Sequence, residues 1–157
     1  MQIVFTSQVV YNDFVPGPHK PGKVFVFSDN LSWQSIDSID VATVTGLAGT
    51  HSGTHTILRR SKPNDVALAQ DIVVWQYEAT FVLNAVTYDG HQLGAGQVTA
   101  RGVWYFKEGV GLVDAQGQPV NDRRHGVTGG TGHYSQVRGQ GFEPFDGHIK
   151  TLEIALL

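Results

Sequence analysis

Two histidines, His51 and His55, stand four residues apart in a short tandem of Gly-Thr-His triplets. On a helix this spacing places both imidazoles on one face, which is an arrangement that binds zinc. The glycines of the tandem disfavour a helix, and on an extended strand the two side chains lie roughly 13 Å apart at ~3.3 Å per residue. Because one ion does not span that distance, we predict no metal site here.

A glycine-rich segment at residues 129–132, with the letters Gly-Gly-Thr-Gly, is the second candidate for chemistry. A phosphate-binding loop continues with a lysine, a hydroxyl residue and a helix. Here His133 and Tyr134 follow instead, in a pattern typical of a strand. We therefore predict a tight turn that uses the positive φ angles open to glycine, and no nucleotide site.

Nucleophilic catalysis lacks its usual residues in this chain. The absence of cysteine excludes disulfides, thiolate nucleophiles and cysteine-based zinc sites together. No serine lies in a Gly-x-Ser-x-Gly elbow. The candidates that remain are acid–base groups, and these depend on the elements that position them.

Those elements are predicted to be strands, because nearly every segment alternates with period two or is a β-branched and aromatic run. The 19 glycines and the low share of charged residues, 16%, also favour strands and turns over helices. An Asp-Gly hairpin turn is predicted at residues 88–90, and a break at the prolines of residues 16–18. One helical turn is predicted over residues 64–70, with Asn64 as its cap. Strands are predicted at residues 2–11, 23–28, 39–45, 52–60, 72–83, 97–106, 126–128, 134–140 and 148–156.

This order of short strands predicts an all-β fold: an eight-stranded antiparallel up-and-down barrel formed by one domain over residues 1–157. A two-sheet sandwich is the alternative. The clearest strand, residues 72–83, has one wholly apolar face and one mixed face. The mixed face is consistent with a barrel interior that holds a ligand and also with an ordinary solvent face. The apolar face consists of Val73, Trp75, Tyr77, Ala79, Phe81 and Leu83.

Charge and hydropathy argue against two classes of partner. The net charge of −3 and the pI near 6.1 leave no concentrated basic face for nucleic acid. No segment approaches the ~20 apolar residues of a membrane span, and the first residues lack the basic start and apolar run of a signal peptide. We expect no nucleic-acid or membrane partner, and a cytoplasmic location unless a signal peptide has been removed.

One segment carries a family resemblance. Val-Thr-Gly-Gly-Thr-Gly-His-Tyr at residues 127–134, followed by Val-Arg-Gly at 137–139, resembles the Val-x-Gly-Gly-Thr-Gly-x-(Phe/Tyr)-x-x-Ala-Arg-Gly signature of dirigent proteins. It is also similar to the Val-Thr-Gly-Gly-Ser-Gly segment of allene oxide cyclases. Weaker matches lie in order at residues 26–31, 46–50 and 77–79, so the resemblance covers about residues 26–140.

The resemblance implies an eight-stranded barrel, usually a trimer, that binds one hydrophobic reactive intermediate without a cofactor. Arg138 matches the signature arginine, and His133 stands where dirigent proteins have an acidic residue. Asp29 falls on an acidic residue of the dirigent proteins and on an asparagine of the cyclases. These matches make Asp29, His133 and Arg138 the candidate catalytic residues.

Our leading hypothesis is a cofactor-independent cyclase or isomerase of secondary metabolism that folds a hydrophobic small molecule and directs stereoselective ring closure. Asp29 and His133 would transfer a proton, and Arg138 would hold a developing negative charge. Asp29→Asn would then lower turnover ~10²-fold or more, and change stability by less than ~1 kcal/mol if the side chain is partly solvated. The candidate substrate-binding residues are Trp75, Tyr77, Glu78, Trp104 and Tyr134.

Two alternatives remain open at this stage. A dirigent-like protein would steer the coupling or cyclisation of a substrate without chemistry of its own. A binding module, for example for sugar, would present exposed tryptophans to its ligand. We further expect a cavity with one mouth, lined by Asp29 and Arg138, and a trimer that covers the apolar face of residues 73–83.

Overall fold

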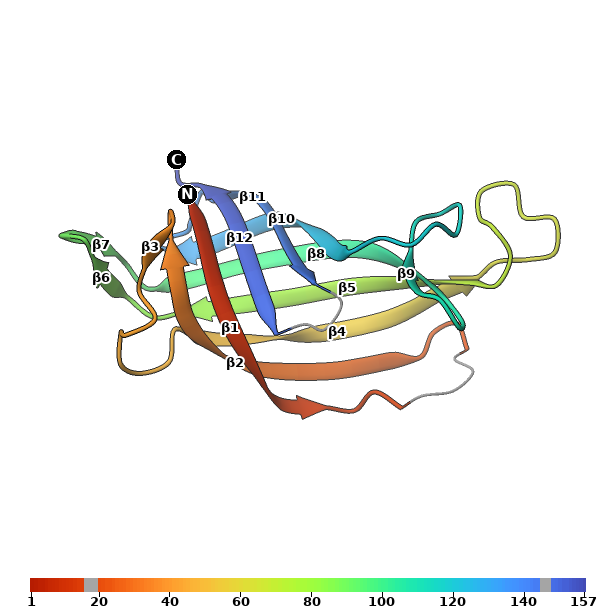
Figure 1. Cartoon of the computed structure of the whole chain (residues 1–157), viewed down its shortest axis with the longest axis horizontal. Helices are drawn as coiled ribbons and strands as arrows, with labels where there is room; N and C mark the ends of the chain where they lie inside the picture. The colour runs from red at the N-terminus through yellow and green to blue at the C-terminus, as the bar shows by residue number, and fades with distance from the viewer. Residues whose placement is uncertain (16–19, 145–147) are drawn as a thin grey trace.

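The chain forms a closed antiparallel barrel, in which eight strands follow one another around the ring in sequence order (Figure 1). This computed structural model describes residues 1–15, 20–144 and 148–157. Pairing of the first strand with both the second and the last closes the ring, so the predicted all-β, eight-stranded up-and-down barrel is confirmed. The ring strands are β1 (Gln2–Asn12), β2 (Val24–Ile36), β4 (Gly49–Arg60), β5 (Ile72–Leu83), β8 (Gly96–Lys107), β10 (Asp122–Gly132), β11 (Arg138–Pro144) and β12 (Ile149–Ala155).

Four short strands lie outside the ring. β3 (Ile39–Asp40) pairs with β2, and β9 (Gly111–Val113) pairs with β8. β6 (Val86–Tyr88) and β7 (His91–Leu93) form a separate hairpin, which projects from one end of the barrel (Figure 1). Its turn residues, Asp89 and Gly90, have φ angles of 47° and 75°, as the predicted Asp-Gly turn requires.

Two segments depart from the predicted strands in the first third of the chain. β2 continues well past its predicted end, because Leu31 and Trp33 keep the inward alternation. The strand predicted over residues 39–45 is reduced to β3, since the Ala42 amide donates to the Asp40 carboxylate in a local turn. The break predicted at residues 16–18 lies outside the described residues.

The helical turn predicted over residues 64–70 is wrong, and the described residues contain no helix. The Asp65 carboxylate accepts hydrogen bonds from the backbone amides of Ala67 and Leu68. It also pairs with Arg59 at 2.6 Å. Side-chain bonds of this kind compete with helical ones, so the segment forms turns.

The strand predicted over residues 134–140 begins only at Arg138. Before it the chain turns twice, because the Tyr134 amide donates to the Thr131 carbonyl and the Val137 amide to the Tyr134 carbonyl. The glycine-rich segment ends β10, and only its last residue, Gly132, has a tight-turn φ of 62°. These turns direct the Tyr134 ring into the barrel, where it is fully buried.

The mixed face of β5 does not line the barrel interior, which was one of the two interpretations of this strand. Its apolar face points into the barrel, where Tyr77, Phe81 and Leu83 are almost fully buried. Its mixed face points outward, so Glu78 is exposed. The apolar face therefore forms the interior and needs no cover from another subunit, which removes the surface argument for a trimer.

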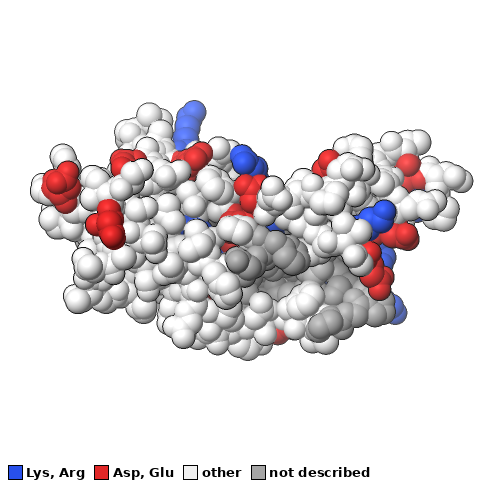
Figure 2. All heavy atoms as spheres, viewed as in Figure 1, with Lys and Arg blue, Asp and Glu red and all other residues white. Residues whose placement is uncertain are grey.

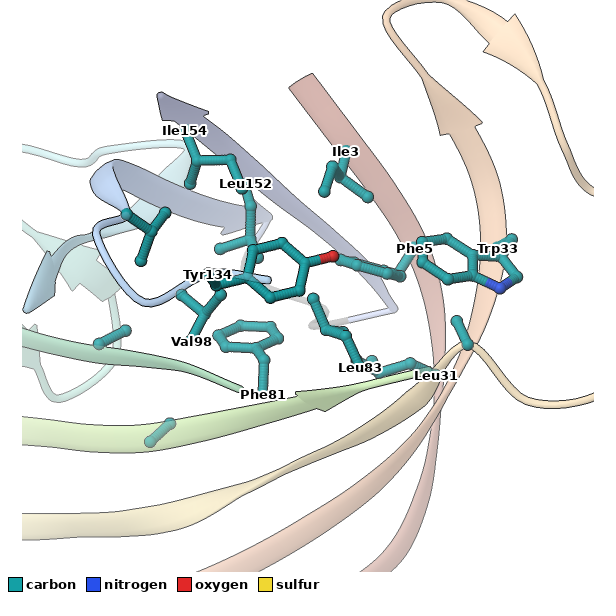
Figure 3. Close-up of a cluster of buried hydrophobic side chains, with 14 of the residues drawn as sticks. Ile3, Phe5, Leu31, Trp33, Phe81, Leu83, Val98, Tyr134, Leu152 and Ile154 are labelled. Atoms are coloured by element: carbon teal, nitrogen blue, oxygen red, sulfur yellow. The ribbon is translucent and has the colours of Figure 1, made fainter. Parts of the chain in front are cut away.

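One end of the barrel interior is apolar except for the Tyr134 hydroxyl, which is buried and has no hydrogen-bond partner among the described residues. Figure 3 shows side chains from β1, β2, β5, β8 and β12 meeting there, together with Tyr134 from the turn before β11. Aromatic rings from three strands are in contact: Phe5 lies 5.4 Å from Trp33 and 6.4 Å from Phe81, between ring centroids. The labelled members of this apolar end are Ile3, Phe5, Leu31, Trp33, Phe81, Leu83, Val98, Tyr134, Leu152 and Ile154.

The surface seen in Figure 2 carries scattered charges. Lysine and arginine side chains are interspersed with acidic ones and separated by uncharged surface, so no patch of one sign dominates this face. An example on the outside of the barrel is the pair of Arg101 and Glu78, 2.9 Å apart and more than half exposed. Over the described ranges, no helix has the length and apolarity needed to cross a membrane.

Candidate functional site

A cavity of about 190 Å³ opens where the short strands of the ring stop. β11 and β12 have 7 residues each, whereas β2, β4, β5 and β8 have 12 or 13 and continue past them (Figure 1). The lining residue Val9 is 57% exposed and marks the side that faces solvent. The cavity is lined by Val9, Asn12, Phe27, Asp29, His51, His55, Tyr77, Arg123, Glu143, His148 and Lys150.

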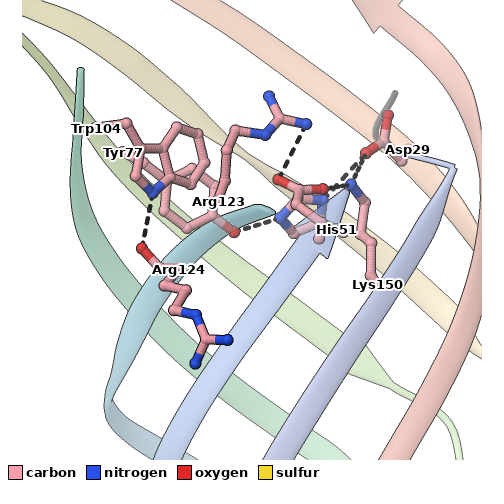
Figure 4. Close-up of polar contacts among 8 residues, drawn as sticks. Asp29, His51, Tyr77, Trp104, Arg123, Arg124 and Lys150 are labelled. Atoms are coloured by element: carbon pink, nitrogen blue, oxygen red, sulfur yellow. Dashed lines mark hydrogen bonds and ion pairs between the residues drawn. The ribbon is translucent and has the colours of Figure 1, made fainter. Parts of the chain in front are cut away.

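Three of these residues form a buried hydrogen-bond chain across adjacent strands. Asp29 on β2 is directly opposite His51 on β4, and His51 Nδ1 lies 3.0 Å from an Asp29 carboxylate oxygen. His51 Nε2 lies 2.6 Å from the Tyr77 hydroxyl, which comes from β5 (Figure 4). The three residues are 5% exposed or less, so solvent competes little for these bonds.

The protonation states of this chain follow from its surroundings. Burial lowers the pKa of His51, and this outweighs the opposing effect of the Asp29 hydrogen bond, so the imidazole is neutral. Burial alone would raise the pKa of Asp29, but the His51 bond and the Lys150 charge lower it below the ordinary value, so the carboxylate is ionised. An ionised carboxylate only accepts, so Nδ1–H donates to Asp29, and Nε2 accepts from the Tyr77 hydroxyl. Burial, then the charge of Glu143, raises the pKa of Tyr77, which stays a phenol.

Asp29 also belongs to a network of four charged side chains, with Lys150, Glu143 and Arg123. Lys150 on β12 donates a short hydrogen bond to Glu143 on β11 and lies 3.5 Å from Asp29. Arg123 on β10 lies 3.5 Å from the other oxygen of Glu143. Burial would raise the pKa of Glu143, but Lys150 and Arg123 lower it, so this carboxylate is also ionised. Two cations thus balance two carboxylates, which is what allows Asp29, Glu143 and Lys150 to be buried, while the Arg123 side chain stays 16% exposed.

Aromatic rings form the walls. Phe27 lies between the two histidines of the tandem, with its ring centroid 4.9 Å from each imidazole. Trp104 stacks on Tyr77 at 4.6 Å, and its indole N–H donates to the Arg124 carbonyl (Figure 4). The walls are therefore flat and apolar, and the polar groups are gathered at one side.

Two further histidines, His55 and His125, flank the Tyr77 ring at 5.7 and 5.0 Å. Burial lowers the pKa of each to about 4, so both are neutral near neutral pH. Neither His125 ring nitrogen has a hydrogen-bond partner among the described residues, and nor does His55 Nε2. The interior of the barrel therefore holds unused hydrogen-bonding groups.

Glycines at inward positions make room for these rings. A Cβ at Gly141 would lie 2.1 Å from His125 Nε2, and one at Gly102 would lie 3.1 Å from the His125 side chain and 3.2 Å from the Trp104 nitrogen. Any larger residue at Gly141 would have to displace the imidazole. The cavity and its walls thus depend on small residues opposite large ones.

Among the residues named from the sequence, Asp29 and Tyr77 line the cavity, and Trp104 lies directly behind it. Trp75 lies in a neighbouring apolar cluster with Phe25 and Ile57. Glu78, the third candidate substrate-binding residue on β5, lies on the outer surface. All three tryptophans are 8% exposed or less, so the exposed tryptophan on which a sugar-binding module depends is not found.

The structure does not bring His133 and Arg138 together with Asp29. Arg138 is five residues from Glu143 along β11, roughly 16 Å at ~3.3 Å per residue, and lines a shallow surface hollow near Met1. His133 is exposed, beside Gly94, at the same end of the barrel. The cavity expected around Asp29 is present, but the expectation that Arg138 lines it is wrong, because strand alternation and distance both place Arg138 elsewhere.

Sequence reasoning missed most of the charged site. His51 was considered only as a metal ligand with His55, and Arg123 was not among the candidate residues. A signal was available for His51, because residues 51, 53, 55 and 57 alternate with Thr and Ser and so share one face of a strand. Lys150 also carries a signal, because it shares one face of its predicted strand with Leu152 and Ile154, whereas no comparable signal identifies Glu143. No group of three or more metal-ligating side chains is found in the part of the chain that the structure describes.

Comparison with known proteins identifies the fold. No family model and no curated protein matches the sequence. Among solved structures, a pyocyanin demethylase is similar over 99% of this chain and 100% of its own, with a TM-score of 0.58 at 19% identity. The chain therefore shares its barrel fold with this demethylase. Two pterocarpan synthase dirigent proteins also match, at TM-scores of 0.48 and 0.47 and identities of 12% and 16%, over 98% of this chain and 84% and 89% of theirs. At 19% identity the likeness to the demethylase shows the fold alone.

Proposed function

We propose that this barrel is a cofactor-independent isomerase or cyclase that moves protons on a small hydrophobic molecule through Tyr77, His51 and Asp29. The observation that carries the proposal is the hydrogen-bond chain from Asp29 through His51 to the Tyr77 hydroxyl, at the wall of a cavity. Such a chain resembles a catalytic triad in which a phenol stands in the place of the usual hydroxyl nucleophile.

The chain acts as a reversible proton relay. A substrate atom gives its proton to the Tyr77 oxygen while the Tyr77 proton passes to His51 Nε2, and the imidazolium that forms is stabilised by the Asp29 carboxylate. The reverse transfer delivers a proton to another atom of the same substrate. The net result is isomerisation, with no redox change. Where the deprotonated atom attacks elsewhere in the folded substrate, the result is ring closure.

The size and walls of the cavity define the substrate class. An engineered cavity of about 150 Å³ holds benzene, so about 190 Å³ accommodates one ring with a few substituents. Aromatic walls favour a flat molecule, and holding its atoms in a near-attack geometry contributes to the rate. This supports an apolar, planar substrate. The pyocyanin demethylase of similar fold is named for a small-molecule substrate, which agrees with this class.

Solvent-to-carbon proton exchange tests the relay without knowledge of the natural substrate. The protein is incubated in deuterated water with cyclohexenone, acetophenone and indanone, and the loss of the α-proton signal is followed by NMR. We expect catalysed exchange of at least one compound. Tyr77→Phe keeps the ring but removes the hydroxyl, so it should slow exchange by about 10²–10⁴-fold.

Glu78→Gln is the matched control, because Glu78 is the next residue on the same strand and lies outside the barrel. It should exchange at the wild-type rate. Exchange by Tyr77→Phe at the wild-type rate would overturn the proposal. Binding of these compounds without any exchange would also overturn it and favour a dirigent-like template. The trimer remains a proposal from the sequence resemblance alone, and light scattering measures it directly.

A further inference from the structure

The cavity contains one cationic donor that the protein leaves partly unused. The Arg123 guanidinium pairs with Glu143 at 3.5 Å through one terminal nitrogen, but its Nε is buried and has no hydrogen-bond partner among the described residues. A buried, unpaired donor on a charged group is costly. A ligand acceptor that fills this position would recover that cost.

Arg123 and Tyr77 both contact the Trp104 indole, which places the guanidinium near the relay. The guanidinium carbon lies 5.0 Å from the Trp104 ring centroid, and the Tyr77 ring stacks on the same indole at 4.6 Å. His55, whose ring is 5.4 Å from Trp104, also leaves its Nε2 without a partner. Arg123, His55 and Tyr77 all line the cavity. A flat molecule in this cavity beside the Tyr77 hydroxyl would therefore also lie near Arg123 and His55.

The charges of the site specify what kind of acceptor fits. Lys150 is engaged with Glu143 and Asp29, and the two cations already balance the two carboxylates. A balanced site favours a neutral ground state, while an Arg with a free N–H favours negative charge that develops on an oxygen. A ketone or enone has this behaviour, because its oxygen is neutral when bound and negative in the enolate.

We infer that the cavity takes flat conjugated carbonyl compounds and that Arg123, rather than Arg138, holds their oxygen. The inference rests on the proposed function and adds its substrate class. The α-carbon gives its proton to the Tyr77 oxygen, and the Tyr77 proton passes to His51. The C–H electron pair forms the C=C bond, while the carbonyl π pair moves onto the oxygen, where Arg123 Nε–H stabilises the enolate. Return of the proton to the oxygen or to another carbon completes the isomerisation.

Two fluorinated probes of nearly equal shape test the oxygen site. Pentafluorophenol is a delocalised phenolate at neutral pH and mimics the enolate, whereas pentafluorotoluene has a methyl group in place of the oxygen. Binding to the whole protein is measured by fluorine NMR. Arg123→Gln should weaken phenolate binding by about 10- to 100-fold, the worth of one hydrogen bond to a charged group, and leave pentafluorotoluene binding unchanged.

Two further variants sharpen the result. Arg123→Lys keeps the charge but has no planar fork, so it should restore only part of the affinity. Arg101→Gln removes an exposed arginine of the outer surface and should bind both probes as the wild type does. Equal losses for both probes in Arg123→Gln, or no loss for either, would overturn the oxygen site. If Tyr77→Phe abolishes exchange while Arg123→Gln binds phenolate normally, the relay stands and the carbonyl site fails.

Discussion

The two ends of the barrel interior are built on the same strands and share aromatic side chains, but only one of them holds charges. On β2, Leu31 and Trp33 face the apolar end, and Asp29 faces the cavity. On β12, Leu152 belongs to the apolar end, and Lys150 to the cavity. A step of two residues along a strand, one repeat of the alternation, is enough to pass from a hydrocarbon core to a buried ion network.

The difference shows that the two ends are stable for different reasons. The apolar end gains free energy from buried area and close packing, which any similar side chain supplies in part. The cavity end depends on complementarity, because each buried charge is tolerated only through its partners. The loss of stability on substitution should therefore follow the change in side-chain volume at the apolar end and the change in charge balance at the cavity end.

The largest effect is expected where the charge balance is broken. Lys150→Met keeps the length of the side chain but leaves Asp29 and Glu143 without their shared cation. Removal of one member of a buried ion pair costs about 3–5 kcal/mol. Leu152→Ala, two residues further on the same strand, should cost a similar 2–5 kcal/mol through a cavity. Urea unfolding measures both.

The pH dependence separates these two variants. In the wild type the lowered pKa values of Asp29 and Glu143 stabilise the fold above their ordinary values of 3.8 and 4.5, and this contribution is lost as the pH falls. In Lys150→Met both pKa values rise relative to those of the wild type, because the cation is lost, so the variant gains less stability than the wild type as the pH rises through them. The deficit of Lys150→Met should shrink in acid, and that of Leu152→Ala should not. Equal pH profiles would show that Lys150 does not balance these carboxylates.

A smaller loss of stability is expected for Asp29→Asn. The amide keeps the shape but loses the charge that faces Lys150 and His51, at a cost of about 1–3 kcal/mol. This exceeds the change of less than ~1 kcal/mol that applies to a partly solvated side chain, because Asp29 is only 5% exposed. Proton exchange should fall by about 10²-fold or more, since the imidazolium loses its counter-charge. Unchanged exchange would remove Asp29 from the relay.

The smallest effect at neutral pH is expected for His125→Phe. The imidazole is neutral and unpartnered, so an aromatic hydrocarbon should change stability by less than about 1 kcal/mol. In acid the variant should be favoured. The pKa of His125 is 6.5 in the unfolded chain and about 4 in the folded protein. Between these values only the unfolded state binds the proton, so the wild type loses stability as the pH decreases.

Thermal melting against pH tests this prediction. Without His125, the free energy of unfolding should change less steeply with pH in acid, by up to about 1.4 kcal/mol per pH unit. The dependence that remains should come in part from His55, whose pKa is lowered in the same way. An unchanged slope would mean that His125 is protonated in the folded protein at these pH values.

The fold was predictable from local signals, whereas most of the site was not. Period-two alternation identified β5 with its observed bounds, and the Asp-Gly dipeptide identified the hairpin turn. Alternation does not say which face of a strand is inward, so the mixed face of β5 stayed ambiguous until the ring was closed. A wholly apolar face was in fact the interior.

The site was hidden because it consists of long-range contacts. Asp29 was found through a motif, but the charge that balances it, Lys150, comes from the far end of the sequence. Lys150 shares a face with Leu152 and Ile154, yet nothing local says which carboxylate it meets, and Glu143 resembles an ordinary solvent charge on its own strand. Only the register around the closed ring brings them together. Arg138 shows the reverse case, since a motif match placed a residue in the site that the register places elsewhere.

The seam between β1 and β12 determines the order in which the site assembles. Every other pairing in the ring joins strands that are consecutive around the meander, whereas this seam joins residues 2–6 to residues 149–153 and so closes the longest loop of the chain. Because closing so long a loop costs chain entropy, we expect this seam to form after the local pairings. Lys150 lies on the seam, directly opposite Phe5. The Lys150–Glu143 pair lies within the β11–β12 hairpin, whereas closure of the ring brings the same cation to Asp29 on β2. We therefore expect the Asp29 carboxylate to remain hydrated until the barrel closes.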